Sequence, residues 1–139
     1  MDPNRVVLVD DHEIIALALG EAITRVPGLV FDGVAATVDD VLARHPEAGL
    51  VVLDLRLADG SSPIGNVERL VERGAAVIVY TSGENPYLLR LVATTAILGI
   101  VRKSDPVSVL VDTLRQAAEG RAVMANEWAN LHMTEFAAI

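Results

Sequence analysis

Five residues at the ends of apolar runs carry the groups that could do chemistry in this chain of 139 residues. Three carboxylates, a hydroxyl and an ammonium group are supplied by Asp10, Asp11, Asp54, Thr81 and Lys103. Crowded carboxylates repel one another, and a divalent cation such as Mg²⁺, which prefers oxygen ligands, relieves that repulsion. A remaining carboxylate can then act as a nucleophile on phosphorus, while the cation, the ammonium and the hydroxyl stabilise the phosphoryl oxygens. The set indicates divalent-cation binding together with phosphoryl transfer.

Lys103 stands out because it is the only lysine in the chain, whereas the other ten basic residues are arginines. An ammonium group is a compact point charge, whereas a guanidinium group is a planar fork. A single lysine at the end of a strand therefore favours a role that needs the point charge.

The candidate carboxylates and the lysine also have simpler interpretations. Asp10 or Asp11 could cap the helix that follows, Asp54 could open a loop, and Lys103 could be ordinary solvated charge. The presence of all of them at successive strand ends favours the chemical interpretation.

Two further residues lie next to these candidates in the sequence. Ser82 is a rival of Thr81 for the hydroxyl role, and the register of the motif favours Thr81. His12 is expected to be a surface residue rather than a metal ligand, because no second histidine lies near it in the sequence.

The hydrophobic pattern alternates between strand and helix periods and predicts the elements that position these residues. Short apolar runs predict strands at residues 6–9, 29–35, 50–53, 77–80 and 97–101, with a helix after each. Five such alternations predict right-handed crossovers and a parallel sheet covered on both faces, a doubly wound three-layer α/β sandwich. The candidate residues then converge at the carboxyl edge of the sheet, where ligands bind in such folds.

Helix boundaries and faces are also predicted from local signals. The first helix is expected to carry its apolar face on Ile14, Leu17, Ala18, Ile23 and Val26. Thr37 is expected to cap the second helix, and Asp105 is expected to cap the last one, with Pro106 at its first position.

The composition excludes several classes of protein. A hydrophobic share of 52% supplies one domain with a core, and a net charge of −8 argues against a nucleic-acid-binding surface. The absence of cysteine excludes disulfides and thiolate metal sites and fits a reducing compartment. No apolar signal segment follows the start, and the longest apolar stretch, residues 88–101, is too short to span a bilayer. We expect a cytoplasmic protein without membrane contact.

Over residues from about 5 to 120, the chain resembles the receiver domain of bacterial two-component response regulators. The motifs that carry the resemblance are VLVDDH at residues 7–12, VVLDLRLADG at 51–60, VIVYTS at 77–82 and GIVRKSDP at 99–106. The first two are most similar to the LuxR-type subfamily, whose members usually carry a C-terminal helix-turn-helix DNA-binding domain. The resemblance implies a flavodoxin-like fold with strand order 2-1-3-4-5.

The resemblance also implies roles for single residues. Asp54 would accept a phosphoryl group from a sensor histidine kinase. Mg²⁺ would be held by Asp10, Asp11, Asp54 and the backbone carbonyl of Arg56. Thr81 would be the switch hydroxyl that moves toward the phosphoryl group, and Lys103 would pair with that group.

A domain organisation and a set of partners follow from the resemblance. Residues 1–121 would be the receiver domain, and residues 122–139 a tail or linker toward an output domain outside this chain, with Asn126 able to cap a final helix. Besides the kinase, the expected partners are a second copy of the chain and DNA, the latter only through the output domain. Transcription regulation would be the output, and Mg²⁺-dependent phosphorylation and dephosphorylation of the domain itself the only catalysis.

Two departures from the family pattern keep an alternative open. Ile100 stands where an aromatic switch residue is common, and Ala58 replaces a frequent proline. Both fit an atypical receiver that acts as a protein-interaction module without phosphorylation. A small Mg²⁺-dependent phosphatase is a further rival, although the chain lacks an Asp-x-Asp motif after a strand.

Overall fold

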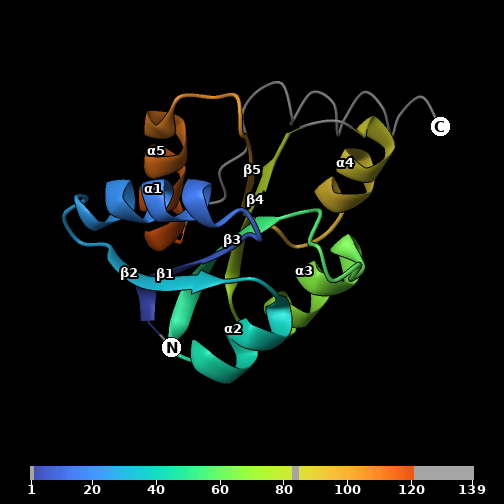
Figure 1. Ribbon diagram of the computed structural model, residues 1–139, viewed down its shortest axis with the longest axis horizontal. Helices are drawn as coiled ribbons and strands as arrows, with labels where there is room; N and C mark the ends of the chain where they lie inside the picture. Colours follow the sequence, from blue (N-terminus) through green and yellow to red (C-terminus); the bar gives the residue numbers. More distant parts are fainter. Residues whose placement is uncertain (1, 83–84, 121–139) are drawn as a thin grey trace.

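The computed structural model describes residues 2–82 and 85–120, in which strands and helices alternate along the chain (Figure 1). The elements are β1 (Asp2–Val9), α1 (Glu13–Thr24), β2 (Val30–Ala35), α2 (Val38–Arg44), β3 (Ala48–Asp54), α3 (Pro63–Glu72), β4 (Ala76–Thr81), α4 (Pro86–Ala93), β5 (Gly99–Arg102) and α5 (Val107–Ala118). The predicted tail at 122–139, with its helix from Asn126, lies outside the described residues, as does residue 121.

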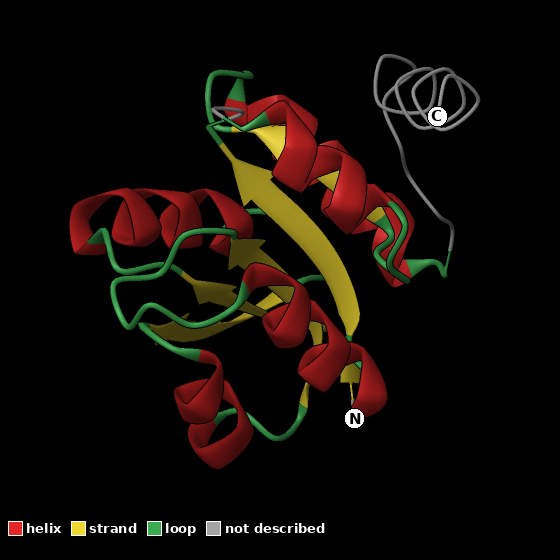
Figure 2. Cartoon of the chain, turned by 90° about the vertical axis from the view of Figure 1, so that its right-hand side faces the viewer, coloured by secondary structure: helices red, strands yellow, loops and turns green. Residues whose placement is uncertain are grey.

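The sheet has the predicted topology. Its strands lie in the order β2-β1-β3-β4-β5, and every neighbouring pair is parallel. Helices α1 and α5 cover one face, and α2, α3 and α4 cover the other (Figures 1 and 2). The doubly wound, flavodoxin-like three-layer sandwich is therefore confirmed. In the described part of the chain, no helix is long and apolar enough to cross a membrane.

The core consists of two apolar layers, one on each face of the central strands. Along β1, Val7 packs toward α2, α3 and α4, whereas the next residue, Leu8, packs toward α1 and α5. Every residue of β3 is buried, as expected for a parallel strand covered on both sides. The two layers fix the register of β1 and β3, because a slip by one residue exchanges their faces.

The predicted buried face of α1 was partly wrong. The side chains of Ile14 and Leu17 are 85% and 58% exposed, and Ala18 is exposed as well. The buried residues of the helix are Ala16, Leu19, Gly20 and Ile23. The helix lies so close to β2 that a Cβ atom on Gly20 would come within 2.5 Å of the Phe31 ring. Gly20 therefore permits the close approach to β2, and Leu19 and Ile23 pack against the sheet while Ile14 and Leu17 remain exposed.

One of the two predicted caps was wrong. The Thr37 hydroxyl accepts a hydrogen bond from the Asp40 N–H at 3.1 Å, as predicted for the start of α2. Helix α5 instead begins after Pro106 without a side-chain cap. The Asp105 carboxylate turns back and accepts a hydrogen bond from the Arg102 N–H at 3.2 Å, which closes the turn after β5.

A polar cluster joins β1, β2 and the end of α2. Asp32 accepts a hydrogen bond from Arg5 at 2.8 Å, and the Nδ1 atom of His45 lies 2.9 Å from its other carboxylate oxygen. Burial alone raises the pKa of Asp32, but the hydrogen bonds and charges of Arg5 and His45 outweigh it and hold that pKa below its ordinary value. The ionised carboxylate is thus favoured by the folded state.

We expect Asp32→Asn to lower the free energy of unfolding by about 1 kcal/mol at neutral pH, because it removes a charged acceptor from two partners. Because the pKa of Asp32 is lowered on folding, its contribution is present above the ordinary aspartate pKa and is lost as the pH falls through the folded value. Urea unfolding of both proteins from neutral to acid pH measures this. A difference that persists in acid would contradict the electrostatic explanation.

Candidate functional site

The parallel register of β1 and β3 places two carboxylates side by side. Val9 pairs with Leu53 at the carboxyl end of the two strands, and Asp10 and Asp54 are the next residues along the chain. The Asp10 N–H donates to the carbonyl of Ala35 at 3.0 Å, so that the end of β1 is also fixed to β2. Side chains from two adjacent strands are thereby held at one edge of the sheet.

Lys103, at the same edge on the side of β4 and β5, reaches the two carboxylates with its ammonium group and is held in place by its backbone. The Lys103 N–H donates to the carbonyl of Thr81 at 2.7 Å, which holds the residue after β5 against the end of β4. The Nζ atom of Lys103 donates to Oδ2 of Asp54 at 2.9 Å and lies 3.6 Å from Oδ2 of Asp10. The predicted convergence of these three residues is therefore present.

Burial makes the negative charge on Asp54 costly. The residue is 6% exposed, and burial, with a smaller effect of the Asp10 charge, raises the pKa of Asp54 despite the hydrogen bonds from Lys103 and the Arg56 N–H. Burial by itself lowers the pKa of Lys103, but the hydrogen bond to Asp54 and the charges of Asp54 and Asp10 outweigh it, so that this pKa lies above its usual range. The ammonium is charged but does not fully compensate the carboxylates.

The remaining negative charge and the free oxygen atoms fit a divalent cation. Ligand atoms of Asp10, Asp11, His12 and Asp54 all lie within 4.8 Å of one another. Within the described residues, Oδ2 of the buried Asp10 accepts no hydrogen bond. A buried carboxylate oxygen without a donor is costly, and a cation would satisfy it. The donor set therefore suits a small divalent cation.

The other predicted residues stand at the same edge. Thr81, which is buried, and Ser82 line one hollow together with Asp54 and Arg56. Both candidate hydroxyl residues, Thr81 and Ser82, thus lie beside Asp54. The Arg56 N–H donates to Oδ1 of Asp54 at 3.2 Å, whereas the role of its carbonyl as a metal ligand stays a prediction.

Two contacts near the site were not predicted from the sequence. His12 is a surface residue, as predicted, with a side chain that is 59% exposed, and its Nδ1 atom lies 2.9 Å from Oδ1 of Asp10. Its position directly after Asp10 and Asp11 at a strand end was the available signal. Tyr80 is buried, and its ring centroid lies 5.9 Å from Nζ of Lys103. The sequence shows Tyr80 only as a strand residue, so nothing there indicated this contact.

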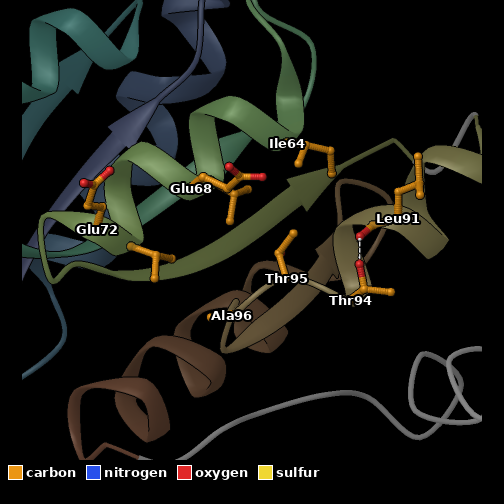
Figure 3. A pocket seen from close by; sticks show the side chains of 9 residues that line it. Ile64, Glu68, Glu72, Leu91, Thr94, Thr95 and Ala96 are labelled. Atoms are coloured by element: carbon orange, nitrogen blue, oxygen red, sulfur yellow. Dashed lines mark hydrogen bonds between the residues drawn. The ribbon is translucent and has the colours of Figure 1, made fainter.

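A larger hollow, of about 500 Å³, lies between α3 and α4 and does not include the acidic site (Figure 3). Its lining is mainly apolar, with Glu68 and Glu72 on α3, Leu91 on α4 and Thr94 directly after that helix. The hydroxyls of Thr94 and Thr95 in this lining donate hydrogen bonds to the backbone carbonyls of Leu91 and Val92, and no positively charged side chain is among the lining residues. The carboxylates and the ammonium group at the sheet edge are better arranged for phosphoryl chemistry than this hollow is.

Comparison with solved structures finds receiver domains of response regulators. A two-component response regulator of the LuxR family from an Aurantimonas species matches with a TM-score of 0.81 at 26% identity, over 96% of this chain and 97% of that chain. A second match, with a TM-score of 0.80 at 20% identity, is the isolated REC domain of RcsB from Salmonella enterica serovar Typhimurium in the presence of phosphomimetic BeF3⁻. It covers 91% of this chain and 96% of that chain. A chain from the structure of two RcsB dimers bound to two parallel DNAs matches with a TM-score of 0.81 at 20% identity, over 92% of this chain and 66% of that chain.

The fold thus resembles that of response regulator receiver domains. The resemblance includes a member of the LuxR family. The chain spans about two thirds of the length of the RcsB chain in the DNA complex. No protein-family model and no curated protein sequence matches it.

The raised pKa of Asp54 predicts that Asp54→Asn stabilises the cation-free protein at neutral pH, because the amide resembles the protonated carboxyl in shape and carries no charge. Since folding raises this pKa, the folded state loses stability as the pH rises from the ordinary aspartate pKa through the folded value. The advantage of the variant therefore grows over that pH range and is absent in stronger acid. Thermal unfolding in EDTA measures it, and an Asn variant less stable than the parent at pH 7 would contradict the prediction.

Proposed function

We propose that this chain is a receiver domain of a two-component signal transduction system, which accepts a phosphoryl group on Asp54 from a sensor histidine kinase. The observation that carries the proposal is the 2.9 Å hydrogen bond from Lys103 to Asp54, made beside the carboxylates of Asp10 and Asp11. A nucleophile, a fixed positive charge and a cation-binding set are thereby present at one sheet edge.

The proposed transfer is a single displacement at phosphorus. A carboxylate oxygen of Asp54 attacks the phosphorus of a phosphohistidine, the new O–P bond forms, and the N–P bond breaks. The imidazole leaves with the electron pair of that bond and takes up a proton from water. Lys103 stabilises the charge on the phosphoryl oxygens, and the hydroxyl of Thr81 or Ser82 donates a hydrogen bond to one of them.

Asp10, Asp11 and Asp54, with the carbonyl of Arg56, would hold Mg²⁺. When bound, Mg²⁺ supplies positive charge that offsets the repulsion between the carboxylates and the incoming phosphoryl group. The proposal includes phosphorylation and dephosphorylation of the chain itself and no turnover of another substrate.

Exposed apolar side chains beside the site support a protein as the phosphoryl donor. Ile14, Ile15 and Leu17 are exposed in the first turns of α1, which begins two residues after Asp11. Exposed apolar side chains gathered on one helix are typical of surfaces that bind proteins. A kinase seated there would lie next to Asp54.

We propose the cytoplasm as the location of the protein.

We further propose that the output is a change in assembly of the chain or in its contact with a DNA-binding domain. The support is the likeness to RcsB, whose dimers are described on DNA, and to the LuxR-family regulator. This part of the proposal concerns a longer protein than the segment described.

A phosphorylation-independent interaction module is the second candidate. Ile100 is 3% exposed and packs in the layer that faces α3 and α4. A buried aliphatic side chain does not supply the aromatic switch residue that is common at this position in the family that the chain resembles. This candidate predicts an unphosphorylated protein with the same fold.

Incubation with acetyl phosphate and Mg²⁺ is expected to add one phosphoryl group to the chain, and EDTA is expected to prevent it. Intact-mass spectrometry measures the adduct, and size-exclusion chromatography of the same sample measures any change in assembly. Asp54→Asn is expected to give no adduct, while Asp59→Asn, at the exposed end of the same loop, is a matched control that retains it. A wild-type chain that stays unmodified would favour the interaction module, and an adduct on the Asp54 variant would refute the assignment.

Lys103→Met is expected to slow phosphorylation by roughly a hundredfold, because it removes the charge that stabilises the phosphoryl oxygens. Lys103→Arg keeps the charge but not its compact shape, and its rate of phosphorylation is expected to lie between those of the parent protein and the Met variant. The rate of adduct formation at fixed acetyl phosphate and Mg²⁺ measures both. An unchanged rate in the Met variant, with its circular dichroism spectrum intact, would exclude a direct role for Lys103.

A further inference from the structure

The ring of His12 lies among the carboxylates. Its Nδ1 atom is 2.9 Å from Oδ1 of Asp10, 3.2 Å from Oδ1 of Asp11 and 4.0 Å from Oδ2 of Asp54. His12 occupies the residue before α1, where a side chain commonly caps the helix, but its side chain makes no capping hydrogen bond. The ring is directed to the acidic residues instead.

These distances agree with a nitrogen atom that shares a cation with the carboxylates. Adjacent ligand atoms around an octahedral cation with bonds of about 2.1 Å lie roughly 3 Å apart. The Nδ1 atom lies at such a separation from oxygen atoms of both Asp10 and Asp11. Independently, Oδ2 of Asp10, a residue that is 6% exposed, accepts no hydrogen bond in the described part of the chain, and its nearest positive charge is Lys103 at 3.6 Å.

The chemistry of the nitrogen determines which cation benefits. Mg²⁺ prefers oxygen ligands, whereas imidazole nitrogen suits transition metals, and Mn²⁺ is the transition-metal ion that also suits carboxylate oxygens. We propose that Nδ1 of His12 is a ligand in the cation site and that it makes the site favour Mn²⁺ over Mg²⁺. This inference rests on the cation site of the proposed function, and it assigns to this chain a specificity that three carboxylates alone do not supply.

A different role for His12 makes the opposite prediction. If the ring acts as a positively charged partner of the carboxylates, it competes with any cation. Its removal then strengthens the binding of Mn²⁺ and Mg²⁺ alike. A ligand and a competitor are therefore distinguished by the sign of the change in Mn²⁺ affinity.

The test measures the dissociation constant of Mn²⁺ from the electron paramagnetic resonance signal of the free ion, and that of Mg²⁺ by competition, on the full chain. His12→Ala is expected to weaken Mn²⁺ binding about tenfold or more and to change Mg²⁺ binding less than about twofold. His12→Asn, which offers an oxygen in place of the nitrogen, is expected to keep Mg²⁺ binding and lose the preference for Mn²⁺. Glu13→Gln, an exposed neighbour that removes a charge but no ligand atom, is the matched control and is expected to leave the ratio unchanged.

Electron spin echo spectroscopy of bound Mn²⁺ gives a second readout. The parent protein is expected to show coupling to a directly bound nitrogen, and His12→Ala is expected to lack it. An unchanged Mn²⁺ to Mg²⁺ ratio without nitrogen coupling, or tighter binding of both ions by His12→Ala, would overturn the role of His12 while leaving the cation site in place. A parent chain that binds neither ion would overturn the cation site itself and with it the proposed function.

Discussion

The repulsion between Asp10 and Asp54 is the constraint on which the site depends. The two carboxylates are adjacent because β1 and β3 are parallel and in register, and both residues are 6% exposed. Water therefore screens them poorly, and the protein must supply the compensating charge. Lys103 supplies part of it, at 2.9 Å from Asp54 and 3.6 Å from Asp10. The rest of the structure can be understood as the means of keeping these three groups together.

The apolar layers provide that rigidity. Residues 6–9 of β1 and 50–53 of β3 are apolar and buried on both faces, so neither strand can shift along the other without moving its side chains into the wrong layer. At the same carboxyl edge, on the side of β4 and β5, the hydrogen bond from the Lys103 N–H to the carbonyl of Thr81 holds the lysine against β4. The two repelling carboxylates are thus held in place by the apolar layers, and the lysine by the backbone.

The sequence was sufficient to predict where the five strands lie along the chain and at which edge of the sheet Asp10, Asp54 and Lys103 meet. The order of the strands could be predicted from the resemblance to the receiver family. These features follow from short β-branched runs and from the rule that the carboxyl ends of parallel strands share an edge. The face of α1 could not be predicted, because the helix is apolar nearly all round and the close approach at Gly20 depends on the distant Phe31. The direction of the His12 ring was equally inaccessible, since it depends on three carboxylates that only the fold brings together.

Charge accounting connects the cation, the lysine and the phosphoryl group. Three carboxylates and one ammonium leave two negative charges at the sheet edge, the amount that one divalent cation neutralises. The acyl phosphate proposed for Asp54 would carry one more negative charge than the carboxylate it replaces and would need further donors in the same buried space. Candidate donors are Lys103, which already donates to Asp54, and the hydroxyls of Thr81 and Ser82, which line the hollow beside it. Any rearrangement that meets the added charge would therefore begin at the ends of β4 and β5, next to α4, where Ile100 is already packed in the core.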